Sequence, residues 1–158
     1  MRNTVRNLIV LSCFFLFFCG ECKKAPNEKH AIKLTNSSQN SIGYYFALGG
    51  KFGNYYSDTI PPASNDYIGK DLGSNKTFYY YFGGSQENLF TGLPKDTLSV
   101  YVFSSDTLSK YPWAEVRNKY KVLKRYDLSL YDLNKLDWTI TYPPSTEMKD
   151  VKMFPVYP

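Results

Sequence analysis

Cysteine and histidine are almost missing from this chain, and their scarcity excludes several kinds of site. The cysteines are Cys13, Cys19 and Cys22, and the single histidine is His30. A disulfide framework for the rest of the chain is therefore excluded, as is a zinc site built from cysteine and histidine. A Ser/His/Asp or Cys/His arrangement would have no general base beyond position 30. The sequence predicts no catalytic residue, no metal site and no cofactor.

Long hydrophobic runs are scarce as well, and only one stands out. It extends from Leu8 to Phe18 and comes after a short segment that carries Arg2 and Arg6 but no acidic residue. A membrane-spanning helix needs about 20 apolar residues, so a permanent transmembrane anchor is not expected. The layout is that of a secretory signal, which predicts a signal peptide at residues 1–18 and an exported protein.

The stretch "LFFCGECKK", residues 16–24, indicates how the exported chain is attached to the membrane. A cysteine directly after such a run resembles a bacterial lipobox, in which the cysteine receives a diacylglycerol. We favour Cys19, because Cys22 follows Glu21, whose carboxylate would have to be buried in a membrane-embedded peptidase. Cys13 would leave "FFLFF" at the new N-terminus, and a plain secreted protein is the remaining alternative. Residues 19–30 then form the lipid-attachment site and a polar tether.

The chain after Cys22 is rich in aromatic residues. It contains all 15 tyrosines and both tryptophans. Tyr, Phe, Val, Ile and Thr recur in short bursts separated by Gly, Pro, Asn and Ser, whereas apolar residues at helical spacing are few. Such residues suit a pleated, half-buried surface. We expect an all-β chain at residues 31–158, a single β-sandwich-like domain with two or three short helices and a C-terminal tail. An α+β fold is the alternative.

Several segments have a strand or loop pattern of their own. Residues 31–36 and 41–48 indicate a hairpin joined by "SSQN", and residues 49–74 a loop-rich crossover with one or two short strands. "TFYYYF" at residues 77–82 alternates Phe and Tyr inward with Thr and Tyr outward. "TLSVYVF" at residues 97–103 is the strongest strand, and "DWTITYPP" alternates before a proline pair.

Helix starts are indicated at four places. Ser85 can begin one helical turn, and Asp106 can cap another. Pro112 is placed to open a helix at residues 113–119. Ser129 and Asp132 have capping-box spacing, with Asp in place of the usual Glu.

The basic stretch "RNKYKVLKR", residues 117–125, has two interpretations. The chain has 19 basic and 14 acidic residues, of which Arg2, Arg6 and Glu21 precede Cys22. The part after Cys22 therefore has 17 basic and 13 acidic residues and a net charge of about +4. Strand alternation would turn Tyr120, Val122 and Tyr126 to the core and Lys119, Lys121 and Arg125 to solvent. Attraction to the phosphates of anionic lipid or lipopolysaccharide is the functional alternative. Nucleic acid is not an expected partner of an exported protein.

Carboxylates offer the one catalytic option, because Asp127, Asp132 and Asp137 lie close together in the sequence. A carboxylate-based hydrolase would need two of them across a cleft. The simpler interpretation is that Asp132 caps a helix while Asp127 and Asp137 are solvated beside it.

Tyrosines that are not needed for the core are candidates for binding. Exposed aromatic rings stack on sugars and anchor protein interfaces. We name Tyr79, Tyr81, Tyr55 and Tyr56 as candidate ligand-binding aromatics, although a small sandwich also fills its core with such residues.

The segments "YKVLKRYDLSLYDLNKLDWTITYPP" and "MKDVKMFPVYP" resemble the C-terminal signature of a family of small Bacteroidota-type lipoproteins, with "IKLTNSS", "SIGYYF" and "DTLSVYVF" as further points of likeness. The resemblance implies an envelope lipoprotein with a β-rich domain and brings no activity with it. Three Asp-Thr-aliphatic triplets are similar to the O-glycosylation acceptor of that phylum, which marks Thr59, Thr97 and Thr107. The same pairs also start strands and cap helices.

Together these features predict an exported protein that is lipid-anchored to the bacterial outer membrane and works by binding. A non-catalytic protein-interaction module is the first expectation, with another envelope protein as partner. A glycan-binding surface lipoprotein is the alternative, and a hydrolase is the least favoured. The orientation toward the periplasm or the cell surface stays open.

Overall fold

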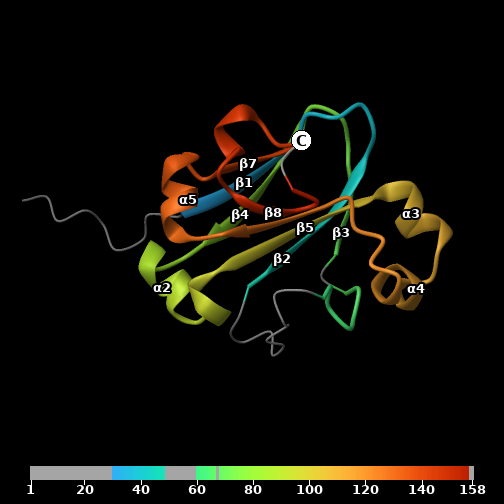
Figure 1. Ribbon diagram of the computed structural model, residues 1–158, viewed down its shortest axis with the longest axis horizontal. Coiled ribbons are helices and arrows are strands. Elements are labelled where there is room, and N and C mark those ends of the chain that lie inside the picture. The colour runs from blue at the N-terminus through green and yellow to red at the C-terminus, as the bar shows by residue number, and fades with distance from the viewer. Residues whose placement is uncertain (1–29, 49–59, 67, 157–158) are drawn as a thin grey trace, which may run out of the picture.

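The computed structural model describes residues 30–48, 60–66 and 68–156, which form two β-sheets packed face to face with short helices at the ends (Figure 1). The strands are β1 (His30–Asn36), β2 (Ile42–Ala47), β3 (Gly69–Leu72), β4 (Lys76–Phe82), β5 (Leu98–Ser104), β6 (Lys124–Leu128), β7 (Thr139–Tyr142) and β8 (Lys152–Phe154). The helices are α2 (Gln86–Thr91), α3 (Ser105–Lys110), α4 (Trp113–Asn118) and α5 (Leu130–Lys135), with short 3₁₀ turns η2 (Pro94–Asp96) and η3 (Thr146–Met148). The sandwich-like fold is confirmed, with more α-helices than the two or three expected.

The two sheets differ in size and direction. The smaller sheet has the order β4-β1-β7, in which β1 is antiparallel to β4 and parallel to β7. The larger sheet has the order β3-β2-β5-β6-β8 and is antiparallel throughout. β5 lies at its centre, and its residues from Leu98 to Phe103 are all buried. This confirms the prediction that "TLSVYVF" is a buried strand.

The predicted hairpin of β1 and β2 is wrong, because the two strands belong to different sheets. The connection at residues 37–41 contains no glycine for the left-handed positions of a tight hairpin turn. Its backbone instead follows the buried side chain of Asn36, which accepts from the Ser38 amide and donates to the Asn40 carbonyl. The chain thus crosses from one sheet to the other, and β1 and β2 face each other across the core.

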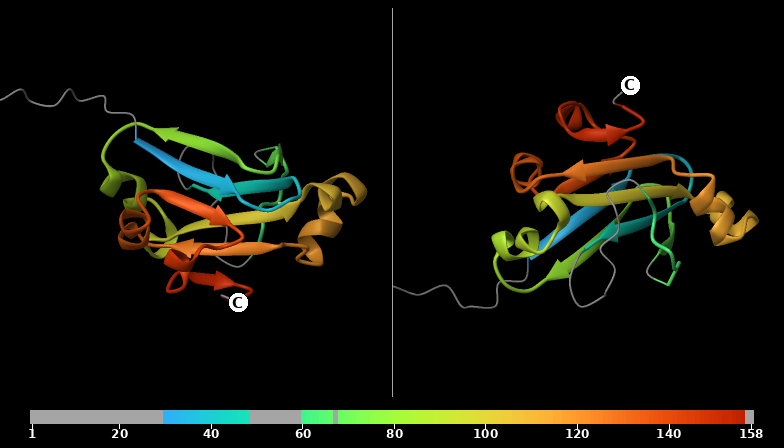
Figure 2. Two further views of the ribbon diagram at one scale, coloured as in Figure 1. Left: turned by 90° about the horizontal axis from the view of Figure 1, so that it is seen from above. Right: turned by 60° about the horizontal axis from the view of Figure 1, so that its bottom comes forward.

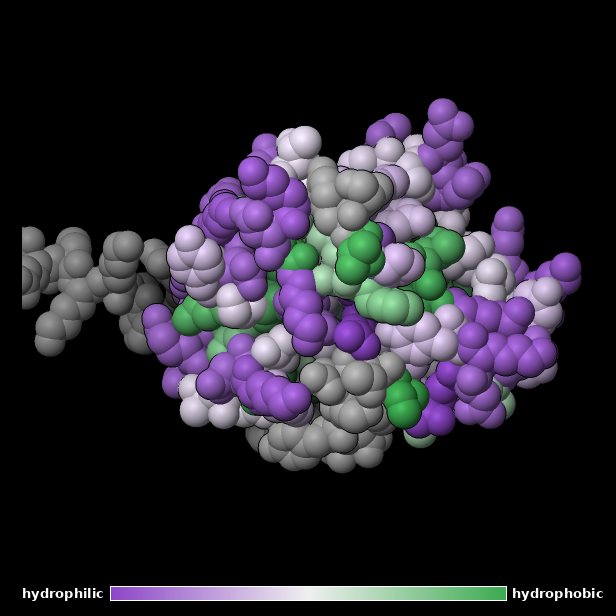
Figure 3. Space-filling model, viewed as in Figure 1, coloured by the Kyte–Doolittle hydropathy of each residue, from purple (hydrophilic) through white to green (hydrophobic). Residues whose placement is uncertain are grey.

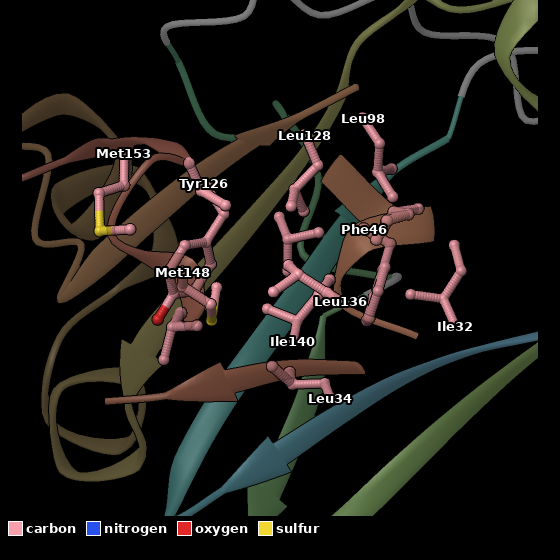
Figure 4. Packing of buried hydrophobic residues seen from close by; sticks show 14 of the residues in the cluster. Ile32, Leu34, Phe46, Leu98, Tyr126, Leu128, Leu136, Ile140, Met148 and Met153 are labelled. Atoms are coloured by element: carbon pink, nitrogen blue, oxygen red, sulfur yellow. The ribbon is translucent and has the colours of Figure 1, made fainter. Parts of the chain in front are cut away.

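The main core lies between the sheets, and both contribute to it (Figure 4). Ile32, Leu34 and Ile140 come from the small sheet and are fully buried. Opposite them lie large side chains of the other sheet and of the turns beside it: Ile42, Phe46, Val100, Val102, Tyr126, Leu128, Met148 and Met153. Each such buried aliphatic or aromatic side chain contributes about 1.5–3 kcal/mol. Tyr126 also joins the sheets directly, since its hydroxyl donates to the Thr141 carbonyl at 2.8 Å.

Stability is expected to fall as the pH rises above about 10, the ordinary tyrosine value. Burial raises the pKa of Tyr126 far above that value, so the folded protein keeps the phenol proton. The unfolded chain releases it, therefore binds fewer protons, and is favoured as the pH increases. Below pH 10 the contribution of Tyr126 is fully present.

Urea unfolding measured from pH 8 to pH 11 checks this. Tyr126→Phe is expected to cost about 1 kcal/mol at neutral pH through the lost hydrogen bond. Above pH 10 it should flatten the decline by about 1.4 kcal/mol per pH unit. Tyr131→Phe is the matched control, because Tyr131 is 75% exposed on α5. An unchanged alkaline slope in Tyr126→Phe would contradict the account.

Helix caps agree with the sequence in most places. Ser85 caps α2 by accepting from the Asn88 amide, and Ser129 and Asp132 form the predicted capping box at α5. The predicted cap of α3 is wrong, because Ser104 rather than Asp106 accepts from the Thr107 amide. Asp106 occupies the first turn, where it faces the positive end of the helix.

The basic stretch forms a strand only from Lys124 onward, so the predicted alternation through residues 119–126 is wrong. Tyr120 has a positive φ of 48°, which breaks the extended backbone before β6. Arg125, predicted to face solvent, has a side chain only 11% exposed. Lys124 is buried, and its ammonium donates to the Pro155 carbonyl at 2.8 Å. Its pKa is lowered by burial. Tyr126 enters the main core as expected, and Tyr120 and Val122 pack against a second, smaller core.

A smaller core covers the outer face of the large sheet at one end. It comprises Tyr45, Ile68, Tyr101, Phe103 and Val116, and it lies beneath α3, α4 and residues 60–66. The indole of Trp113 donates to the Pro62 carbonyl, and the guanidinium of Arg117 donates to that of Pro61. Of the crossover at residues 49–74, the described part contains the single strand β3.

Candidate functional site

Strand β4 turns two tyrosines to solvent, as its sequence predicts. Phe82 is buried, and Phe78 and Tyr80 pack against the main core. The alternate residues Tyr79 and Tyr81 are 47% and 62% exposed. The left view of Figure 2 looks onto this face of the small sheet, where no helix lies over β1 and β4. Both tyrosines are therefore available to a partner.

The two rings are held in a defined arrangement. Their centroids are 6.0 Å apart, and their planes differ by 13°. They stand on one strand with one residue between them, so the backbone fixes their spacing. Two neighbouring rings in nearly parallel planes make a contact surface that loses little side-chain entropy on binding.

Strand β1 supplies the neighbours of these rings. Its register places Lys33 opposite Tyr79 and the small residue Ala31 opposite Tyr81. Beyond Tyr79 the hydroxyls of Thr35 and Thr77 lie 2.9 Å apart and hydrogen-bond each other. We define the tyrosine surface as Tyr79, Tyr81, Lys33, Thr35 and Thr77. It combines apolar rings with hydroxyls and one positive charge.

The charge of Lys33 is only weakly neutralised. Its ammonium lies 3.8 Å from the carboxylate of Asp137, whose side chain is 97% exposed. Surface pairs of this kind contribute less than about 1 kcal/mol. Lys33 can therefore leave Asp137 for a ligand at little cost.

Aromatic packing beneath the surface makes β4 rigid. The ring of Phe78 lies 4.4 Å from that of Tyr44, and the ring of Tyr80 stacks on Phe46 at 5.9 Å. Burial raises the pKa of Tyr44 and of Tyr80, so both phenols stay neutral. A neutral, packed row behind β4 supports the exposed tyrosines without attracting charged ligands itself.

The three candidate carboxylates have separate structural roles. Asp127 is 1% exposed and accepts from the Ser99 hydroxyl, the Arg125 guanidinium and the Lys152 ammonium. Asp132 belongs to the capping box of α5, and Asp137 reaches solvent. No two of them share a partner. The expected solvation of Asp127 is therefore wrong, and its contacts give the hydrolase alternative no support.

The basic stretch is largely engaged within the chain. Lys119 and Lys121 both pair with the carboxylate of Glu115, and Lys121 also lies 3.9 Å from the centre of the Tyr111 ring. Arg125 pairs with Asp127. These contacts already neutralise cations that binding to lipid phosphates would require. The geometry therefore gives the lipid-phosphate alternative no support.

A pocket of about 200 Å³ lies beside α3 and α4. Its lining comprises Asn65, Ile68, Lys70, Leu108, Tyr111, Pro112, Trp113 and Val116. Its indole and guanidinium neighbours already bond the backbone of residues 61 and 62. Asn65, Lys70 and Tyr111 bring polar groups to the lining, but the described lining has no carboxylate, histidine or cysteine. The tyrosine surface, with its two ordered rings, is the stronger candidate.

A second group of exposed apolar residues lies near the C-terminal end. It consists of Leu123, Phe154 and Val156. Figure 3, viewed as in Figure 1, shows hydrophobic side chains near the middle of the molecule, surrounded by hydrophilic ones. The Phe154 ring meets Tyr120 edge-on at 5.7 Å, and Lys124 holds the backbone at Pro155. These contacts indicate that the segment closes the end of the sheet.

Several predicted positions lie outside the described residues, namely Cys13, Cys19, Cys22, Tyr55, Tyr56 and Thr59. Of the other candidate glycosylation sites, Thr97 donates its hydroxyl to the Lys95 carbonyl, and Thr107 is half-buried in the first turn of α3. The sequence did not single out Lys33 and Thr35, whose place beside the tyrosines depends on the pairing of β1 with β4. It also missed the exposed Tyr131.

Comparison of the chain with protein-family models, curated proteins and solved structures finds no match. Within residues 30–48, 60–66 and 68–156, no helix has the length and apolar character needed to cross a membrane. In the same part of the chain, no three His, Cys, Asp or Glu side chains come together as ligands for a metal ion.

Proposed function

We propose that this chain is an exported, lipid-anchored protein-interaction module that binds through the tyrosine surface and catalyses no reaction. The observation that carries the proposal is the pair of exposed, nearly parallel rings of Tyr79 and Tyr81 on a rigid strand. Tyrosine is enriched among the residues that dominate binding energy at protein interfaces. A sheet face with apolar rings and a polar border, and with no pocket among its described residues, suits a protein partner better than it suits a small molecule.

Chemical cross-linking in intact cells tests the protein-interaction proposal. The unmodified chain is expected to give a discrete complex with another envelope protein. Tyr79→Ala with Tyr81→Ala should reduce its yield by about tenfold or more, because each lost anchor of this kind costs about 1–2 kcal/mol or more. Tyr131→Ala, which removes a still more exposed tyrosine from α5, should leave the yield unchanged. Equal yields from both variants would contradict the assignment.

Glycan binding is the second candidate, and it is favoured by one specific feature. The parallel rings lie beside the hydroxyls of Thr35 and Thr77 and the ammonium of Lys33. Rings that stack on sugar faces, next to groups that bond sugar hydroxyls, form a saccharide-binding surface. Retention on immobilised polysaccharide that is lost in Tyr79→Ala and kept in Tyr131→Ala would favour this candidate. Normal retention of Tyr79→Ala would remove it.

Lipid attachment is proposed at Cys19, with Cys22 as the alternative. Cys19→Ser is expected to abolish incorporation of a labelled fatty acid and to release the protein from the membrane fraction, because the serine has no thiol for the thioether. Cys22→Ser should leave both unchanged. The reverse result would move the site to Cys22, and labelling of both variants would contradict lipidation at either position alone.

The envelope location is part of the same proposal. The anchor would hold the domain at the outer membrane, where it faces either the periplasm or the cell surface. Digestion of the domain by proteinase on intact cells would place it at the surface and make glycans and foreign proteins the leading partners. Protection until lysis would place it in the periplasm. O-linked sugars at Thr59, Thr97 or Thr107 would appear as a mass increase lost on mutation to alanine.

A further inference from the structure

The free side of β4 is the feature from which we infer a second mode of association. β4 is the outermost strand of the small sheet and pairs with β1 alone. The amides of Lys33 and Ser37 donate toward β7, so the alternate backbone groups of β1 face β4. In the register of the two strands, the backbone groups of Leu34 and Ile32 lie opposite those of Phe78 and Tyr80. The backbone groups of Tyr79 therefore point to the open side, and no described residue bonds them there.

The other sheet edges are short and protected. β7 has four residues and is followed by Pro143 and Pro144. β3 has four residues, carries Lys70 and Asp71, and pairs irregularly with β2. β8 has three residues and is followed by Pro155. Short length, charge, proline and irregular pairing are the usual means of preventing one sheet edge from joining another.

β4 has none of these protections beyond its first residue. It is seven residues long and pairs with β1 in an unbroken register. After Lys76 it contains neither a charged residue nor a proline. An edge of this kind is a template for a further strand.

We propose that β4 pairs antiparallel with β4 of a second copy, with Tyr79 opposite Tyr79. This is the only antiparallel register that pairs all seven residues of both strands. It places Thr77 opposite Tyr81 on the outer face and Phe78 opposite Tyr80 on the inner face. Aromatic pairs of this kind stabilise antiparallel strands. Lys76 meets Phe82, so no two like charges lie opposite each other.

The inner face gives a second reason for this register. Phe78 and Tyr80 are only half-buried, although they pack against the main core. Each would be covered by the other residue from the second copy, which removes apolar surface from water. On the outer face, the pairs of Tyr79 and Tyr81 from both copies would form one row of four rings. A doubled tyrosine surface would bind a repeating partner by avidity, and this consequence alone rests on the proposed function.

Sedimentation of the full chain in detergent, together with cysteine cross-linking in membranes, tests the dimer. The unmodified chain is expected to be a dimer. Tyr79→Lys sets two ammonium groups opposite each other and should weaken dimerisation by about tenfold or more. Thr77→Pro should also weaken it, because it removes an amide on the open side and none that bonds β1. Tyr131→Lys is the control for an added charge.

Cross-linking checks the register. Opposed Tyr79 residues would have Cα atoms about 5.5 Å apart, within the range of a disulfide. Tyr79→Cys should therefore give a disulfide dimer well above the background of the chain's own cysteines, and Tyr131→Cys should not. A monomeric unmodified chain, or a dimer that persists in both Tyr79→Lys and Thr77→Pro, would overturn the proposal. A disulfide from position 79 to another protein would also overturn it, since the occupant would then be a foreign strand.

The two proposals fail in different ways. An unmodified chain that is monomeric and still gives the complex with another envelope protein would overturn the dimer alone, and a dimer that gives no such complex would overturn the proposed function alone. Tyr81→Ala should weaken that complex while the backbone pairing of β4 persists.

Discussion

Replacing Asp127 with alanine is expected to lower the free energy of unfolding by about 3–5 kcal/mol. The carboxylate is almost fully buried and accepts from Ser99, Arg125 and Lys152 at 2.9, 3.0 and 3.2 Å. Its loss leaves the guanidinium of Arg125, whose side chain is 11% exposed, without its carboxylate partner. Lys152 is 72% exposed and can turn to water, so it adds little to the cost.

Chemical denaturation of Asp127→Ala, compared with Asp137→Ala, measures this effect. Asp137 is the matched control, because its carboxylate is exposed and its single ion pair is long. Its removal should change stability by less than about 1 kcal/mol. A double variant, Arg125→Met with Asp127→Leu, should recover much of the loss, since it leaves no buried charge unpaired. Equal denaturation midpoints for the two alanine variants would show that Asp127 is not the buried ion-pair partner described.

Replacing Asn36 with leucine is expected to cost about 2–4 kcal/mol, because several buried groups lose their partner at once. The side chain is fully buried. Its amide nitrogen donates to the carbonyls of Asn40 and Leu72, both at 2.8 Å. Its oxygen accepts from the amide and the hydroxyl of Ser38. One side chain thus fixes the crossing from β1 to β2 and the end of β3.

The loss of stability in Asn36→Leu should lower the midpoint of chemical denaturation and raise the rate of amide hydrogen exchange near residue 38. The Ser38 amide loses its acceptor in Asn36→Leu and should exchange faster. Asn40→Ala is the control, since its side chain is exposed and only its carbonyl takes part. Unchanged exchange at Ser38, with normal stability, would mean that the backbone holds the crossing without Asn36.

Local patterns predict the elements whose cause is local. The alternation in β4 predicts which of its side chains are exposed, and the spacing of Ser129 and Asp132 predicts the capping box. β5 is predictable because it is apolar on both faces. Each of these signals depends on a few adjacent residues and needs no knowledge of the partner strand.

Features that depend on distant pairing are not predictable in this way. β1 and β2 would have the same alternation of apolar and polar residues whether they formed a hairpin or belonged to different sheets. Only the pairing of β1 with β4 and β7, and of β2 with β5, distinguishes the two arrangements. The burial of Asp127 depends on Ser99, which is 28 residues away in the chain. Lys33 joins the candidate site through the register of β1 against β4. The tyrosines of the site can therefore be found from the sequence, and their polar neighbours cannot.

Photo-cross-linking in intact cells tests the central claim, binding through the tyrosine surface, most directly. A photoreactive phenylalanine analogue would replace Tyr81 in one variant and Tyr131 in another, since both side chains are well exposed. The account predicts an adduct with a different envelope protein from position 81 and none from position 131. Equal adducts from both positions, or none from position 81 while the protein is folded and anchored, would contradict it.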